Sequence, residues 1–143
     1  MSNYVQVIAG LVVFYVGLKM FAGGMKSMAV PSHLNYWLGH PLWMFVGGIA
    51  VTILWQSSSL STTLIVGLVA SGIVPLPAAI AFTLGANIGT TFTAHLTAWF
   101  LSSGPPSGDT LRIAVVHTLV NLLMALGLLP FVHHIARLVS RLG

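Results

Sequence analysis

From residue 27 to residue 108 the sequence contains no aspartate, glutamate, lysine or arginine. Of all 143 residues only 4% are charged, whereas 57% are hydrophobic. A soluble domain has about a quarter of its residues charged, so this chain lacks the surface that water requires. In hydrocarbon a helix satisfies its own backbone hydrogen bonds, and we therefore predict an all-α integral membrane protein.

The sparse charges also exclude classes of function. The five lysines and arginines are scattered and form no basic stripe, so nucleic acid is not an expected partner. Cysteine is absent, which excludes disulfides and thiolate metal sites. The single carboxylate, Asp109, lies in a turn-like segment at 102–110, and an enzyme would need better placed acids or bases. We expect neither an enzyme nor an organic cofactor.

Apolar stretches separated by turn residues divide the chain into four segments. The first, with one lysine near its end, is long enough at 1.5 Å per residue to cross a hydrocarbon core of about 30 Å. The last is a second full span. The predicted elements are a spanning helix at 4–25, a helical hairpin at 41–74, a broken helix at 77–101 and a spanning helix at 111–132.

Two polar segments interrupt this apolar pattern, QSSSLSTT at 56–63 and GANIGTT at 85–91. The halves that flank the first are each too short to cross, so residues 41–74 form either a re-entrant hairpin or one broken helix that crosses. We favour the hairpin, because 34 residues are too many for one tilted span. In the second segment, Gly85 and Gly89 supply backbone freedom and predict a break in the helix.

Polar breaks at membrane depth indicate a binding site, because exposed backbone is tolerated there only where protein or water satisfies it. The N-terminus of a half-helix attracts an anion, while carbonyl and hydroxyl oxygens suit a small hard cation such as sodium. Two breaks therefore predict a carrier that couples an anion to a cation. One alternative is that the hydroxyls only bond back to their own helices. Another is a channel-like or structural subunit without coupled transport.

The two polar segments also carry a family resemblance. QSSSLSTTLIVGLVASGIV followed by LGANIGTTFTAHLTA resembles the repeat unit of the sodium/phosphate cotransporter family, which includes the type II phosphate carriers. GLKMFAGGMKSM at 17–28 and RIAVVHTLVN at 112–121 are similar to two further stretches of that repeat. The chain departs from the family pattern at Leu60, Ser61 and Val120, where alanine, threonine and phenylalanine are usual. The resemblance implies a sodium-coupled secondary transporter of inorganic phosphate, of which this chain is a half-length, single-repeat member.

The resemblance further implies roles for individual side chains. Hydroxyl and amide groups at the hairpin tip would bind phosphate, and neutral oxygens of both polar segments would bind sodium, the coupling ion. The implied substrate residues are Gln56, Ser57, Ser58, Ser59 and Ser61, the implied sodium ligands are Gln56, Thr62, Thr63, Asn87, Thr90 and Thr91, and His117 and Asn121 are possible supporting residues.

One repeat supplies half of a midplane site, so the chain is expected to need a partner in the bilayer. We expect a homodimer whose two chains are inverted, so that Gln56–Ser59 of both copies meet; the alternative is a heterodimer with a second half-length subunit. The basic residues favour one orientation instead, because four lie on one face, Lys19, Lys26, Arg137 and Arg141, and only Arg112 lies on the other. The expected location is the plasma membrane, as a multi-pass protein of a prokaryotic inner membrane.

Overall fold

The computed structural model describes residues 3–27, 31–100 and 108–142, and every element in these residues is a helix. This confirms the all-α fold class. The turn expected at 102–110 lies largely outside the described residues. The elements are α1 (Asn3–Lys26), α2 (Ser32–Gly39), α3 (Pro41–Trp55), α4 (Ser58–Ala70), α5 (Leu76–Phe100), α6 (Gly108–Leu128), the short 3-10 helix η1 (Leu129–Phe131) and α7 (Val132–Val139).

Two stretches of the described chain are long and apolar enough to cross a membrane. They are Tyr4–Phe21 in α1 and Gly108–Val139, which includes α6, η1 and α7. A third span results if α2 and α3, which meet at an angle of 87°, are taken together. The 25 residues of α5 extend for about 37 Å, which is long enough to cross a membrane. Its polar residues make α5 less apolar than the two stretches above, so it is not counted with them. The chain is a membrane protein.

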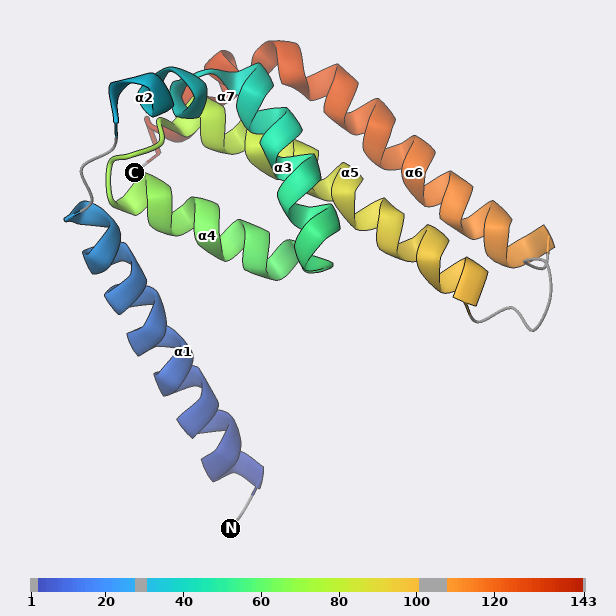
Figure 1. Cartoon of the computed structure of the whole chain (residues 1–143), viewed down its shortest axis with the longest axis horizontal. Helices are drawn as coiled ribbons and strands as arrows, with labels where there is room; N and C mark the ends of the chain where they lie inside the picture. Colours follow the sequence, from blue (N-terminus) through green and yellow to red (C-terminus); the bar gives the residue numbers. More distant parts are fainter. Residues whose placement is uncertain (1–2, 28–30, 101–107, 143) are drawn as a thin grey trace.

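Helices α3 and α4 form a hairpin whose tip is Gln56 and Ser57 (Figure 1). Helix α3 runs from α2 to the tip, and α4 returns toward the start of α5. With 15 and 13 residues, the two helices are about 22 Å and 20 Å long, so neither could cross the hydrocarbon core alone. Gly72, whose φ is +77°, turns the chain from α4 into α5.

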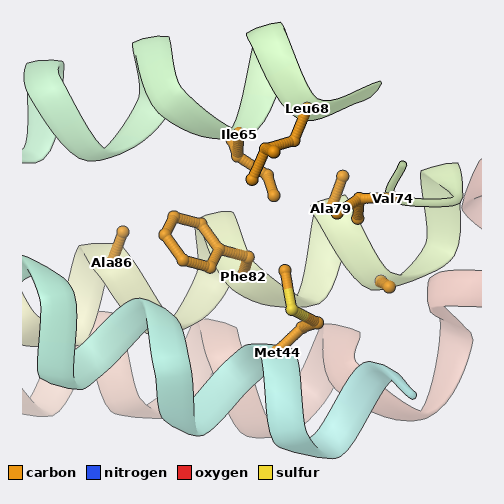
Figure 2. Close-up of a cluster of buried hydrophobic side chains, with 8 residues drawn as sticks. Met44, Ile65, Leu68, Val74, Ala79, Phe82 and Ala86 are labelled. Atoms are coloured by element: carbon orange, nitrogen blue, oxygen red, sulfur yellow. The ribbon is translucent and has the colours of Figure 1, made fainter. Parts of the chain in front are cut away.

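The core lies where α5 packs between the two arms of this hairpin. Phe82 of α5 is 4% exposed and points into the space between α3 and α4, where it meets Met44 from one arm and Ile65 and Leu68 from the other (Figure 2). Along its length α5 presents small side chains, which allow the neighbouring helices to approach closely. The small buried residues of α5 are Ala78, Ala79, Ala81, Gly85, Ala86, Gly89 and Ala98.

The prediction that the helix at 77–101 is broken is wrong, because α5 continues through residues 85–91 without interruption. Gly85 and Gly89 serve close packing and not a break. A Cβ added to Gly85 would lie 2.0 Å from the carbonyl oxygen of Phe45, and one added to Gly48 would lie 2.1 Å from that of Phe82. Helices α3 and α5 therefore touch through their backbones, as helices with glycines four residues apart do in membranes.

After α6 the chain continues through the short helix η1, which contains Pro130, into α7, which packs against α5 with Val132 and Ala136 buried. Helix α6 itself lies along α5 (Figure 1). A hydrogen bond joins the two helices, with His95 Nε2 2.8 Å from Thr118 Oγ1. Because the Thr118 hydroxyl donates to the carbonyl of Ala114, it accepts from His95, which places a proton on Nε2.

Helix α1 stands apart from this core (Figure 1). None of its described side chains is buried. It meets α4 where the ring of Phe21 covers Gly67, with the ring 2.4 Å from the position that a Cβ of Gly67 would take. The side chain of Lys26, one of the four basic residues assigned to a common face, lies outside the described residues.

Candidate functional site

The hairpin tip departs from helical geometry at two residues, Gln56 and Ser57, and the first of them is strained. Its φ is +51°, in the left-handed region that a residue with a Cβ rarely adopts. The amide of Gln56 still bonds to the carbonyl of Thr52, which ends α3. Ser57 then adopts an extended conformation and caps α4, because its hydroxyl accepts from the amide of Leu60 at 3.2 Å.

The side chain of Gln56 holds this strained conformation in place. Its Nε2 donates to the carbonyl of Ile53, and its Oε1 accepts from the hydroxyl of Thr93 at 2.8 Å. The second bond crosses from the hairpin tip to α5. Thr93 is a site residue that the sequence analysis missed, although it lies only two positions beyond GANIGTT and extends the same polar run.

A buried hydrogen-bond chain braces the hairpin behind its tip. Thr52 donates to Ser61 at 2.8 Å, and Ser61 donates to the carbonyl of Ser57 at 3.0 Å. Both Thr52 and Ser61 are 0% exposed. Ser61, one of the implied substrate residues, therefore supports the fold of the tip here and does not face a cavity, and Thr52 is its unforeseen partner.

A cavity of about 420 Å³ opens beside the first turns of α4. It brings together Ser58, Ser59, Thr62 and Thr63 of α4 with Asn87 of α5, all of them implied ligands, because these α4 residues lie on adjoining faces one turn apart. Leu18 of α1 and Val66 complete the lining.

The remaining implied ligands lie outside this cavity lining. The hydroxyls of Thr90 and Thr91 donate to the carbonyls of Ala86 and Ile88 on their own helix. On α6, Asn121 donates to the carbonyl of His117 in the same way, and His117 is exposed. A threonine hydroxyl that donates its proton still has lone pairs, so Thr90 and Thr91 remain able to contact a cation.

The electrostatics of the cavity come from neutral dipoles. None of its lining residues is charged. The first hydrogen bond of α4 runs from the amide of Ser61 to Ser57, so the amides of Ser58 and Ser59 have no acceptor within the helix. They add partial positive charge beside two hydroxyls. Such an arrangement can bind an anion without a fixed counter-charge. In the described chain no cluster of three or more histidine, cysteine or acidic side chains could hold a metal, so cation binding would rely on neutral oxygens.

Comparison with known proteins decides the family. The model of the Na⁺/Pi-cotransporter family matches residues 6–143, almost the whole chain. The chain belongs to the Na⁺/Pi-cotransporter family. The match includes both polar segments, the hairpin tip and the whole of α5, so the cavity described above is built from residues of the family domain.

Relatives of this family member include mammalian and bacterial proteins. Sodium-dependent phosphate transport protein 2A of Ovis aries is 40% identical over 114 residues, which cover 73% of this chain and 18% of that protein. Protein 2B of Homo sapiens is 40% identical over 95 residues, covering 65% and 14%. The protein YqeW of Bacillus subtilis is 34% identical over 88 residues, covering 59% and 29%. The chain thus spans less than a fifth of the length of the mammalian relatives. No solved structure matches it.

Proposed function

We propose that this Na⁺/Pi-cotransporter family member carries inorganic phosphate across the plasma membrane of a prokaryotic cell, coupled to sodium. The observation that supports this most is the cavity at the start of α4, which is lined by four hydroxyl-bearing residues and by no charged residue, and lies beside two amides that have no acceptor within the helix. Phosphate accepts several hydrogen bonds, and neutral donors let a carrier release it again. The names of the mammalian relatives give the same substrate and the same coupling ion.

Within the cavity, Ser58 and Ser59 donate to phosphate through their amides and hydroxyls, and Thr62 and Thr63 extend this polar face. Ser57 caps the helix and Ser61 braces the tip from within, so both act by positioning the donors. The oxygens of Gln56 and Asn87, with the hydroxyls of Thr90 and Thr91, form the sodium site. Thr93 orients the carboxamide of Gln56 toward α5. His117 and Asn121 support this half-site from α6.

The cavity is open, and polar groups at the tip are exposed. Gln56, Ser59, Thr62 and Asn87 all remain exposed, although polar side chains at membrane depth need protein or water around them. A second repeat in the opposite orientation would cover them and supply the other half of the site. We propose that the second repeat is another copy of this chain, inverted in the bilayer. The alternative is a second half-length subunit.

Sodium dependence tests the proposed coupling. In liposomes that contain the purified chain, phosphate uptake should follow a sodium gradient and fall to background when choline replaces sodium. The reason is that the cavity offers neutral oxygens, which suit sodium, and no carboxylate that could relay protons instead. Undiminished uptake in choline across a pH gradient would contradict the proposal. A channel-like subunit would pass one ion without requiring the other.

Topology tests the inverted homodimer. Tags placed after Gly143 should be accessible from both sides of the membrane in comparable amounts, because each dimer has one chain in each orientation. Tags accessible from one side only, in a protein that transports when purified alone, would exclude the inverted homodimer. Transport that appears only after a second half-length subunit is added would identify the heterodimer instead.

A further inference from the structure

A second polar surface lies on α7, which packs at the start of α5, whereas the hairpin tip bonds to α5 farther along, at Thr93. At 100° per residue, the polar residues His133, His134 and Arg137 fall on one half of α7 and its apolar residues fall on the other, and Ser140 and Arg141 follow in the turn after the helix. Part of the apolar half packs on α5 through Val132 and Ala136, while Leu138, Val139 and Leu142 are exposed. The polar surface consists of His133, His134, Arg137, Ser140 and Arg141.

The arginines of this surface have no anionic partner in the described chain. The one acidic side chain of the sequence, Asp109, pairs with Arg112 at 3.0 Å, at the far end of the 21-residue helix α6 (Figure 1). The guanidinium of Arg137 uses its Nε to donate to the carbonyl of His133 at 3.3 Å. Its terminal nitrogens carry no hydrogen bond within the described residues, and Arg137 and Arg141 are both exposed, so they are free to bind an external anion.

Two grooves meet at Arg137. One, of about 250 Å³, is lined by His134, Arg137, Leu138 and Arg141. The other, of about 440 Å³, has an apolar floor of Leu76, Pro77 and Ala136, with His133, Arg137 and Ser140 at its rim. The first groove is basic and the second is largely apolar, so the pair matches a molecule with an anionic group next to hydrocarbon.

We propose that α7 binds the headgroup of an anionic membrane phospholipid. The phosphodiester accepts from Arg137 and Arg141, which line the same groove, and the glycerol and the start of an acyl chain lie over Leu76, Pro77 and Ala136. Basic amphipathic helices at the membrane surface bind anionic lipid by this combination of charge and apolar contact. The lipid would therefore fix the end of α6 and the start of α5 to one leaflet.

Competition between lipids tests this site. The full chain in detergent, given equal amounts of phosphatidylglycerol and phosphatidylcholine with identical acyl chains, should retain phosphatidylglycerol about tenfold in excess when native mass spectra are recorded. The double variant Arg137→Gln, Arg141→Gln should lose this preference. Arg137→Lys, Arg141→Lys should keep most of it, because the charge remains.

The matched control is Arg112→Gln, which removes one basic residue at the other end of α6 and should keep the preference. Excess inorganic phosphate should also leave it intact, since free phosphate makes no contact with the apolar groove. The proposal is overturned if the unchanged chain shows no preference for phosphatidylglycerol, or if inorganic phosphate removes that preference. It is also overturned if Arg112→Gln loses the preference as fully as the double variant Arg137→Gln, Arg141→Gln. All variants are compared after circular dichroism shows the same helix content, so that a folding defect is recognised as such.

Discussion

The double variant Gln56→Gly, Ser58→Ala is expected to lose sodium-dependent phosphate uptake by about a hundredfold while it folds and inserts normally. Each substitution removes a hydrogen-bonding group from the proposed site, and a bond to a charged ligand contributes roughly 1.5–3 kcal/mol. Two such losses correspond to about two factors of ten or more. Glycine is chosen at position 56 because it adopts the φ of +51° without strain, so the hairpin keeps its turn.

Uptake of radiolabelled phosphate into liposomes measures this effect. Ser71→Ala is the matched control, because Ser71 ends the same helix at its other end and its hydroxyl donates to the carbonyl of Leu68. Its uptake should equal that of the unchanged chain. Wild-type uptake by a well-inserted double variant would show that the hairpin tip does not bind the substrate or its coupling ion.

Replacing Gly48 with alanine is expected to lower the free energy of unfolding by about 3 kcal/mol. The new Cβ would lie 2.1 Å from the carbonyl oxygen of Phe82, and a backbone oxygen cannot rotate away as a side chain could. Helices α3 and α5 must therefore move apart, and Met44 and Phe82 lose contact in the core (Figure 2). Thermal unfolding in detergent, followed by the fluorescence of the four tryptophans, measures the loss.

The neighbouring residue provides the control. A Cβ added to Gly47 meets nothing within 4 Å, so Gly47→Ala should change stability by less than about 1 kcal/mol, and in the stabilising direction. The two substitutions are chemically identical and adjacent in α3. Equal stability of the two variants would mean that α3 and α5 do not pack through their backbones.

The sequence predicts the membrane environment and the hairpin tip because both depend on composition over many residues. Seven polar side chains between Gln56 and Thr63 have no place in hydrocarbon unless the helix ends there, and the structure has α3 ending at Trp55. The same reasoning fails for GANIGTT. Gly85 and Gly89 permit a break and equally permit two backbones to touch, and only the position of Phe45 and Ile49 on the opposite helix decides between them.

Two residues of the candidate site could not be identified from the sequence for a related reason. Thr93 belongs to the site because it bonds to Gln56, 37 positions earlier, and Thr52 because it bonds to Ser61. A single sequence does not show which of many threonines lies opposite a given carboxamide. The exposure of Ser59 and the burial of Ser61 are equally invisible in a run of serines, since both follow from how α4 rotates against α3 and α5.

The loose attachment of α1 has a consequence for the order in which the protein assembles. A membrane helix that contains all its own hydrogen bonds is stable in the bilayer before it meets any neighbour. Since α1 joins α4 where Phe21 covers Gly67, its docking is an equilibrium separate from the packing of α3, α4 and α5. Leu18 reaches the cavity only through this docking. We therefore expect the last wall of the proposed binding site to be added after insertion, when α1 docks against α4 within the plane of the membrane.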